Sequence, residues 1–357
     1  MADSPVQKGR GAPSNPAGRF ERLSFVHEPG DELDAEARPA RPTELFRDNS
    51  RSILTFNDSP DVGMDASVNP YRGCEHGCIY CYARPNHEYL GLSAGEDFES
   101  RIFVKENAAA LLRTALSAKS WSPQVIAFSG VTDPYQPIER TLRITRSCLE
   151  VLAEFRNPVA IITKNHLVTR DIDLLASLAG HRAAQVFLSI TTLDDGLARV
   201  MEPRASRPGL RLDALRKLRE AGVPAGVMVA PIIPALTDHE VPAILEAAAG
   251  AGAMFAGCTV VRLPHGVKDL FTQWLDVHAP QRKEKVLNRL RAIRGGKLND
   301  STFGARMVGE GPFAESIHQM FELHRRRLGL TQRVTLSTQA FRRLGGNQLD
   351  LFGCGVD

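Results

Sequence analysis

The sequence predicts an α/β fold with a parallel sheet, because strand-length apolar runs alternate with amphipathic helical segments. The spacing of apolar residues identifies the helices: they recur on one face between Ile138 and Leu152, and another such segment ends at Gly222. Parallel strands need right-handed crossovers, so reactive side chains are expected in the loops after the strands. The predicted strands are Ala66–Asn69, Val125–Ser129, Val159–Thr163, Val186–Ile190, Ala225–Ala230 and Cys258–Leu263.

Length and composition are those of an ordinary globular protein. The chain has 357 residues, 43% hydrophobic and 24% charged, without an apolar run of about 18 residues that would span a membrane. The N-terminus lacks the pattern of a secretory signal, so we expect a cytoplasmic protein with no membrane contact. Composition divides the chain into a mostly disordered leader (1–50), a sheet domain (51–280), a basic helical extension (281–345) and a flexible tail (346–357).

The helical extension is strongly basic, with 14 Lys and Arg residues against 5 Asp and Glu between positions 281 and 345. It includes the run His324-Arg325-Arg326-Arg327 and the pair Arg342-Arg343. Such a segment can attract the phosphates of DNA without reading the base sequence, or it can form a solvated helical face. The composition leaves both interpretations open.

Three cysteines lie close together in one loop after the first predicted strand. Cys74, Cys78 and Cys81 follow the spacing C-x3-C-x2-C. Structural zinc sites use four ligands, usually from paired motifs, whereas iron–sulfur clusters are held by closely spaced cysteines. Three cysteines leave one iron of a [4Fe-4S] cluster open to a small molecule. The alternative is a zinc site completed by His76 or His87.

This spacing, with the aromatic Tyr80 before the last cysteine, resembles the signature of the radical S-adenosylmethionine (SAM) superfamily. The resemblance implies that Cys74, Cys78 and Cys81 hold a [4Fe-4S] cluster whose open iron binds the amino and carboxylate groups of SAM. It also implies that one electron from the cluster cleaves the sulfonium bond, and that a 5′-deoxyadenosyl radical then abstracts hydrogen from the substrate. Such enzymes take the electron from a donor such as flavodoxin or ferredoxin.

Polar residues recur where the second, third and fourth strands end. Thr132 and Asp133 follow the second strand, Lys164 follows the third, and Ser189 lies at the end of the fourth. The carboxyl ends of parallel strands meet at one edge of the sheet, so these side chains together predict a ligand site there.

The order of these segments is similar to that in the spore photoproduct lyase-like branch of the superfamily, over residues 66–263. The resemblance implies a partial (β/α)6 barrel and contacts between SAM and Thr132, Lys164 and Ser189. It also implies an apolar contact with adenine after the fifth strand, which Ile232 and Ile233 would suit. The predicted cofactor-binding residues are therefore Tyr80, Thr132, Asp133, Lys164, Ser189 and Ile233.

The sequence leaves two features of the site undecided: the hydrogen donor, and the role of Glu202 and Arg204. True photoproduct lyases carry a hydrogen-donating cysteine three residues before the aspartate that Asp133 matches, and this chain has Gly130 there. The lyase reaction itself is therefore not implied, and residues such as Tyr82 are alternative hydrogen donors. Glu202 and Arg204 fit either a ligand-binding pair or a salt bridge.

The tail contains Gln348-Leu349-Asp350-Leu351-Phe352 after a Gly-Gly linker. Short extended peptides of this kind dock apolar side chains into a preformed groove, while a polar residue fixes the register. The pentapeptide resembles the motif with which proteins bind the bacterial sliding clamp, so Gln348, Leu349, Leu351 and Phe352 are predicted to contact that partner. It can also form a terminal strand on the chain's own surface.

Together these features predict a radical SAM enzyme, lyase-like or oxidoreductase-like, that acts on DNA in repair or base modification. Two alternatives remain. One is the same chemistry on a protein or small molecule, and the other is a non-catalytic iron–sulfur or zinc protein that binds nucleic acid.

Overall fold

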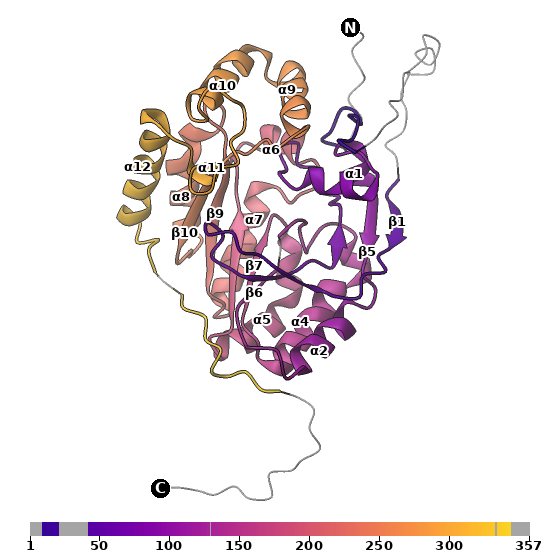
Figure 1. Cartoon of the computed structure of the whole chain (residues 1–357). Coiled ribbons are helices and arrows are strands. Elements are labelled where there is room, and N and C mark those ends of the chain that lie inside the picture. Colours follow the sequence, from indigo (N-terminus) through magenta and orange to yellow (C-terminus); the bar gives the residue numbers. More distant parts are fainter. Residues whose placement is uncertain (1–8, 21–41, 129, 333, 344–357) are drawn as a thin grey trace, which may run out of the picture.

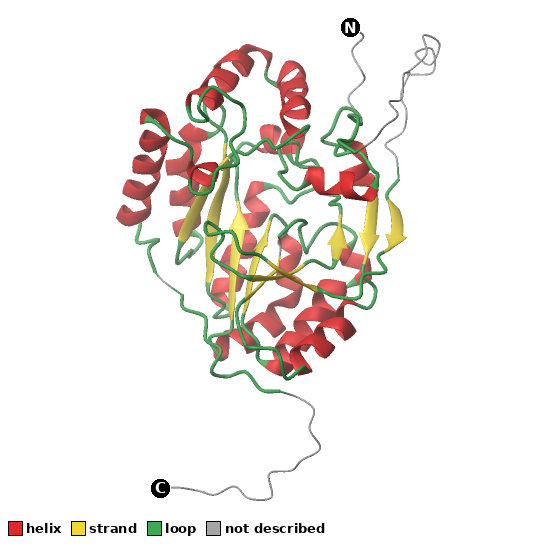
Figure 2. Cartoon of the chain, in the orientation of Figure 1, coloured by secondary structure: helices red, strands yellow, loops and turns green. Residues whose placement is uncertain are grey.

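A seven-stranded sheet forms the centre of the protein (Figure 1, Figure 2). The computed structural model describes residues 9–20, 42–128, 130–332 and 334–343. The predicted parallel strands are confirmed and lie side by side in chain order, with an antiparallel strand, β2 (Leu54–Phe56), at one edge. Because β10 forms the other edge, the sheet is open, as a partial barrel requires. The parallel strands are β3 (Ala66–Val68), β6 (Ile126–Phe128), β7 (Val159–Thr163), β8 (Ala184–Ser189), β9 (Ala225–Ile232) and β10 (Ala256–Val260).

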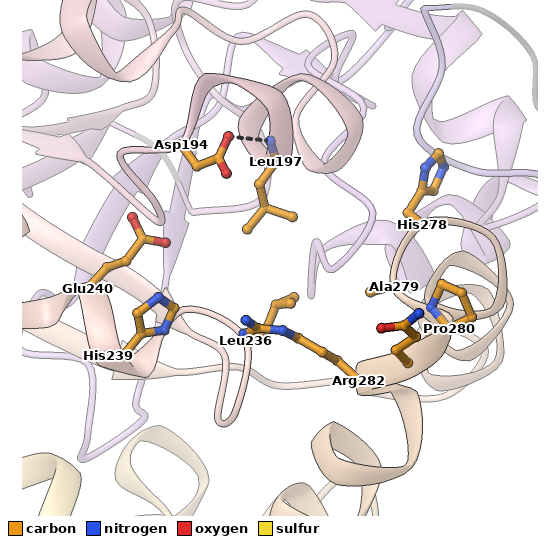
Figure 3. Close-up of a pocket in the computed structure, with 10 residues that line it drawn as sticks. Asp194, Leu197, Leu236, His239, Glu240, His278, Ala279, Pro280 and Arg282 are labelled. Atoms are coloured by element: carbon orange, nitrogen blue, oxygen red, sulfur yellow. Dashed lines mark hydrogen bonds between the residues drawn. The ribbon is translucent and has the colours of Figure 1, made fainter.

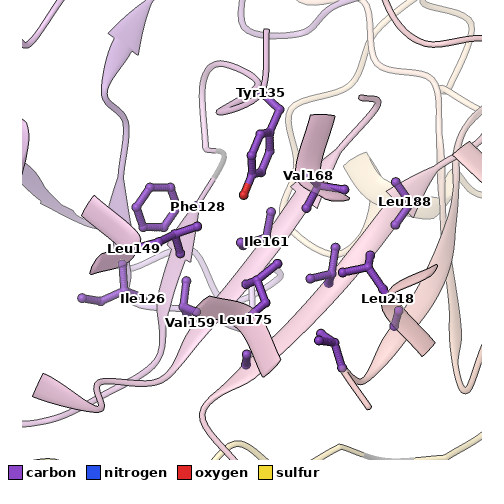
Figure 4. Close-up of a cluster of buried hydrophobic side chains, with 14 of the residues drawn as sticks. Ile126, Phe128, Tyr135, Leu149, Val159, Ile161, Val168, Leu175, Leu188 and Leu218 are labelled. Atoms are coloured by element: carbon purple, nitrogen blue, oxygen red, sulfur yellow. The ribbon is translucent and has the colours of Figure 1, made fainter. Parts of the chain in front are cut away.

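Helices connect the successive strands and pack against the sheet (Figure 2). Their buried side chains meet those of the strands in one core, where Leu149 lies beside Ile126 and Phe128 (Figure 4). Each fully buried Leu, Ile or Phe side chain contributes roughly 1.5–3 kcal/mol through the hydrophobic effect. The longer connecting helices are α2 (Ala108–Ser117), α4 (Ile144–Phe155), α5 (Ile172–Gly180), α7 (Pro208–Glu220) and α8 (Val241–Gly250), and the shorter ones are α1 (Glu96–Ser100), α3 (Glu139–Leu142) and α6 (Asp195–Met201).

One predicted helix is interrupted. The apolar pattern from Ile138 to Leu152 suggested a continuous segment, but Arg143 adopts a φ of 55° and separates α3 from α4. The second predicted segment is confirmed as α7, and Gly222 follows it with the positive φ of 77° that ends many helices.

A small second sheet, which the sequence did not predict, joins the N-terminal region to the strand before the cysteines. In it β1 (Glu44–Arg47) pairs in parallel with β5 (Arg101–Val104), and β4 (Tyr71–Arg72) pairs antiparallel to β5. The predicted disordered leader over 1–50 is therefore wrong for residues 44–47. All side chains of β1 are exposed, so the strand leaves no hydrophobic pattern in the sequence.

Four helices follow β10 within the described residues. They are α9 (Val267–His278), α10 (Pro280–Ala292), α11 (Ala305–Val308) and α12 (Pro312–Arg327), and α12 packs against α8. At the end of α12, Arg325 and Arg326 both pair with Glu322 on the same helix. This part of the basic run thus has the intrahelical pairs of a solvated face.

Two of the predictions concern what the protein contacts: membranes and the sliding clamp. Within the described ranges, no helix combines the length and apolarity that crossing a membrane requires. The predicted clamp-binding residues Gln348, Leu349, Leu351 and Phe352 lie outside the described residues.

Candidate active site

The three cysteines lie in a loop that meets the carboxyl ends of the parallel strands. The Ile79 N–H donates to the carbonyl of Met201, in the helix directly after β8, at 3.0 Å. Tyr80 lies beside Lys164, the residue after β7, with 5.6 Å between the ammonium nitrogen and the ring centroid. The loop therefore lies at the edge of the sheet where the polar residues were predicted to gather.

A buried ion pair organises the cysteine loop. Arg84 and Glu99 are both fully buried, and Nη2 of Arg84 lies 2.5 Å from Oε1 of Glu99. The guanidinium also donates twice to the carbonyl of Cys78, at 3.0 and 2.9 Å, and to the carbonyls of Ala94 and Gly95. The planar fork of arginine can satisfy several acceptors at once, so this pair fixes the backbone at the middle cysteine.

An N-terminal segment, residues 10–12, contacts the same carboxylate. The N–H groups of Gly11 and Ala12 donate to the two oxygens of Glu99 at 2.9 and 2.8 Å, and Arg10 donates to the Glu99 carbonyl at 2.7 Å. Ala12 also packs in the apolar cluster that contains Cys78. The predicted disorder is therefore wrong for residues 10–12 as well. The order of this segment was not predictable from sequence, because its partners are remote in the chain.

Gly77, in the cysteine loop, lies against Glu99. Its φ is +66°, and a Cβ at this position would lie 2.7 Å from Oε2 of Glu99. We expect Gly77→Ala to lower the free energy of unfolding by about 2–3 kcal/mol, measured in urea, because a steric conflict adds to the left-handed penalty. In the control Gly222→Ala, φ is +77° but no atom lies within 4 Å, so the loss should be only about 1 kcal/mol. Equal losses would contradict the tight contact with Glu99.

The thiols of Cys74 and Cys78 are buried and that of Cys81 is half-buried. Burial raises the pKa of all three, and the nearby carboxylates of Asp133 and Glu202 raise it further for Cys74 and Cys78 respectively. Binding of iron would therefore release protons from these thiols. Among the described residues, no three His, Cys, Asp or Glu side chains converge as ligands of a single metal ion. A four-iron cluster is wider than an ion, so its ligands stand farther apart.

The histidines that would complete a zinc site have other contacts. Nδ1 of His76 lies 3.4 Å from Oδ2 of Asp133, and Nε2 lies 3.0 Å from the Asn165 amide nitrogen. Nε2 of His87 lies 2.9 Å from the carbonyl of Arg101, and burial lowers the pKa of this ring to about 4. Both histidines thus support the loop, and the three thiols remain as the candidate ligand set.

Asp133 holds the loop after β6 against the end of β7. One carboxylate oxygen accepts from the Thr163 hydroxyl at 2.7 Å and from the Tyr135 N–H at 2.9 Å, and the other accepts from the Lys164 N–H at 2.8 Å. Burial would raise the pKa of this carboxyl, but His76 and these donors hold it below its usual value. The contacts give Asp133 a positioning role within the site.

Thr132, the residue before Asp133, has a hydroxyl with no partner among the described residues. The side chain is buried, and its Oγ1 makes no hydrogen bond within the part of the chain that the structure describes. The neighbouring turn is fixed by Asn69, whose Oδ1 accepts from the N–H groups of Gly130 and Val131, both at 3.1 Å. An unpaired buried hydroxyl costs free energy, and a ligand that bonded to it would remove that cost.

A polar network surrounds Lys164. Its ammonium donates to the Thr191 hydroxyl at 3.1 Å and lies 3.1 Å from Oε1 of Glu202. Glu202 is buried and also contacts the Tyr80 hydroxyl and the Arg211 guanidinium. Although burial would raise the pKa of the Glu202 carboxyl, Arg211 and Lys164 hold it far below its usual value. Tyr80 and Lys164, both predicted from the sequence, are thus joined through a carboxylate.

The pairing considered for Glu202 and Arg204 is wrong. Glu202 pairs with Arg211, whereas Arg204 pairs with Glu75 at 3.0 Å. Sequence reasoning missed Arg211, although a signal was present: Arg211 lies seven residues before Leu218 on the same helix, and both are buried. An arginine at helical spacing from core residues predicts a buried partner carboxylate.

Ser189 and Ile233 lie at the predicted edge of the sheet. Ser189 ends β8, and its carbonyl accepts from Arg211 at 2.8 Å. Ile233 directly follows β9 and is fully buried in the apolar cluster that also contains Cys78 and Tyr80. The structure therefore brings Ile233 to the cysteine loop, and places Ser189 on the neighbouring strand.

A cavity of about 660 Å³ lies nearby but is lined by other residues (Figure 3). Its wall includes Asp194 before α6, His239 and Glu240 before α8, and His278 and Arg282 at the junction of α9 and α10. Asp194 caps α6 by accepting from backbone N–H groups. None of the predicted cofactor-binding residues lines this cavity, so we do not assign the SAM site to it.

Comparison with known proteins gives relatives that each match part of this chain. An uncharacterised protein of Mycobacterium tuberculosis is 38% identical over 213 residues, 58% of this chain and 62% of that protein, so the match spans less than two thirds of the relative. An uncharacterised protein of Methanocaldococcus jannaschii is 33% identical over 52% of this chain and 67% of its own. The radical SAM Nalpha-GlyT isomerase of Pseudomonas phage M6 is 25% identical over 74% of this chain and 52% of its own.

Solved structures of spore photoproduct lyase share the fold. The enzyme complexed with dinucleoside spore photoproduct has a TM-score of 0.56 at 16% identity, covering 80% of this chain and 79% of that one. A mutant with bound AdoMet and the same dinucleoside has a TM-score of 0.55 at 17% identity, covering 80% and 78%. The family model described as the radical SAM superfamily matches residues 68–248. Members are enzymes that use a [4Fe-4S] cluster and SAM, and this chain belongs to the radical SAM superfamily.

Proposed function

We propose that Cys74, Cys78 and Cys81 hold the [4Fe-4S] cluster and that the enzyme acts on DNA. The observation that carries the first part is the set of three thiols on a loop fixed at the carboxyl edge of the sheet. At the same edge lies the Thr132 hydroxyl, which has no partner within the described part of the chain. When bound, the cluster supplies one electron to the sulfonium of SAM, giving methionine and a 5′-deoxyadenosyl radical that takes hydrogen from the substrate. The electron would come from a donor such as flavodoxin or ferredoxin.

The surrounding residues would bind and orient SAM. The Thr132 hydroxyl, unbonded in the described structure, would bond to SAM, and Lys164 is a compact cation that can exchange Glu202 for the carboxylate of SAM. Ser189 offers a second hydroxyl, and Asp133 holds Thr132 and Lys164 in register through its backbone contacts. The ring of Tyr80 and the side chain of Ile233 would pack against the apolar parts of the cofactor.

Support for a DNA substrate comes from the solved relatives and from charge. Spore photoproduct lyase binds a dinucleoside photoproduct, and this chain shares its fold. The extension over 281–345 has 14 basic and 5 acidic residues, and this excess of positive charge favours binding of a polyanion such as DNA. Gly130 stands where true photoproduct lyases have a hydrogen-donating cysteine, so the proposal extends to repair or modification of a base and not to that lyase reaction.

The proposal is tested by anaerobic reconstitution with iron and sulfide, followed by dithionite and SAM. We expect absorption at about 400 nm from the cluster and release of 5′-deoxyadenosine, which DNA should stimulate. Release that a protein or small-molecule extract stimulates, and DNA does not, would favour the alternative substrates. A coloured protein that releases none would contradict the radical reaction.

Thr132→Val should separate cofactor binding from stability. Valine keeps the shape of threonine and removes a hydroxyl that has no partner in the described structure. The free energy of unfolding should stay the same or rise by up to about 1 kcal/mol, while the Kd for SAM, measured by equilibrium dialysis, should rise about fivefold. Thr114→Val is the control, since its hydroxyl bonds to Ala110 on the exposed face of α2. Unchanged affinity in Thr132→Val would contradict the contact with SAM.

We further propose that the tail recruits the enzyme to the sliding clamp in the cytoplasm. The double variant Leu351→Ala, Phe352→Ala removes the apolar side chains that would enter the groove. We expect the Kd for the purified clamp to rise at least about tenfold, measured by surface plasmon resonance. Gln7→Ala, near the other end of the chain, is the control and should bind as wild type does. Equal binding by wild type and the double variant would contradict the role of the tail.

A further inference from the structure

Arg262 follows β10 and lies beside the end of the cysteine loop. Its guanidinium carbon is 5.5 Å from the ring centroid of Tyr82, the residue directly after Cys81, and Nη1 is 3.8 Å from the sulfur of Met307. Its Nε is buried and makes no hydrogen bond within the described residues. Neither a ring nor a thioether neutralises a full positive charge, so these two contacts compensate the partly buried Arg262 only weakly.

The nearby carboxylate of Asp61 favours the charged form of Arg262 only in part, because Asp61 is paired with another arginine. Arg294 is 2% exposed, bonds to two backbone carbonyls, and likewise leaves its Nε without a partner in the described chain. Arg306 is paired with Asp61. Burial lowers the pKa of both Arg262 and Arg294, and each is lowered further by a nearby arginine. Buried charges in proteins are normally paired, so this group of arginines favours an anionic ligand.

Two exposed aromatic rings flank these arginines. Tyr82 is 51% exposed and Phe303 is 56% exposed, and the guanidinium of Arg306 lies 4.5 Å from the Phe303 ring centroid. Arg306 and Met307 are adjacent on α11, so the Arg306–Phe303 pair lies next to the Arg262–Tyr82 pair. Proteins that bind single strands combine cations for the phosphates with exposed rings on which bases stack. A peptide carboxylate would use the cations but leave both rings without a role.

We propose that Arg262, Tyr82, Phe303 and Arg306 bind one strand of a polynucleotide, with a phosphate on Arg262 and an unstacked base on an exposed ring. This inference rests on the proposed action on DNA and names the surface that recognises it. Enzymes that modify a base must take it out of the helical stack, and this surface would receive the displaced nucleotide beside the cysteine loop.

The test is binding of a fluorescent single-stranded oligonucleotide to the cluster-loaded full chain, followed by anisotropy over a range of salt. Arg262→Gln should raise the Kd about tenfold and reduce the slope of log Kd against log salt by about 0.7, because one phosphate contact is lost. Phe303→Ala, a change on the surface that should not disturb folding, should raise the Kd at least about fivefold with the slope unchanged.

Two control variants match these changes elsewhere on the molecule. Arg216→Gln removes an exposed arginine of α7, and Tyr89→Ala removes a ring that is 70% exposed beneath Arg19, a cation already paired with Glu88. If wild type binds and all four variants bind equally well, the proposed surface is wrong while the proposed function stands. If wild type binds polyglutamate of equal charge as tightly as the oligonucleotide, both this surface and the DNA substrate are wrong.

Discussion

Cys78→Ala is expected to reduce the release of 5′-deoxyadenosine by at least about a hundredfold, because a cluster with two thiolate ligands is not held in place. Absorption at about 400 nm should fall with it, since the same ligand is needed to assemble the cluster. The backbone of Cys78 should keep its position, because Arg84 binds its carbonyl and not its thiol. The measurement is 5′-deoxyadenosine by liquid chromatography after anaerobic reconstitution with SAM and dithionite.

Cys258→Ala is the matched control for that experiment. Cys258 is a half-buried cysteine on β10 and does not belong to the C-x3-C-x2-C motif of the cysteine loop. It should retain both the absorption and the release of 5′-deoxyadenosine. If Cys78→Ala releases as much 5′-deoxyadenosine as Cys258→Ala does, the three cysteines do not hold the cluster that cleaves SAM.

Arg84→Met is expected to lower the free energy of unfolding by about 3–5 kcal/mol, because it leaves the carboxylate of Glu99 buried without its cation. Both side chains are fully buried, and the substitution also removes the hydrogen bonds to the carbonyls of Cys78, Ala94 and Gly95. The measurement is urea denaturation of the protein before reconstitution, so that loss of the cluster does not contribute.

Arg113→Met provides the comparison for Arg84→Met. Arg113 and Glu154 form an ion pair in which the two side chains are 45% and 44% exposed. Exposed pairs of this kind contribute about 0–1 kcal/mol, so the control should lose little stability. If Arg84→Met loses no more than Arg113→Met, the buried pair does not organise the cysteine loop.

The parallel sheet was predictable because its signals are local. Each strand is a short apolar run, and the buried strands β6 to β9 leave such runs wherever they pass through the core. The break at Arg143 was not predictable, because the apolar spacing continues across a residue whose φ is positive. The second sheet was missed because the side chains of β1 are exposed and its pairing with β5 is long-range.

The candidate site was predictable in its residues but not in their partners. Spacing identified the cysteines, and position after the strands identified Thr132, Asp133 and Lys164. Which polar atoms are already satisfied depends on the folded arrangement: Asp133 accepts from Thr163 and Lys164, whereas the Thr132 hydroxyl has no partner in the described residues. The network around Glu202 joins residues from several elements and has no signature in any one of them.

Transfer of carbon-bound deuterium from DNA tests the proposed reaction most directly. The reconstituted, reduced enzyme would be incubated anaerobically with SAM and uniformly deuterated DNA, either damaged or undamaged. 5′-Deoxyadenosine and recovered SAM would then be analysed by mass spectrometry. We expect deuterium in one of these two products with at least one of the DNA substrates, because the 5′-deoxyadenosyl radical takes hydrogen from its target. 5′-Deoxyadenosine formed without deuterium, and no deuterium in SAM, would contradict the action on DNA.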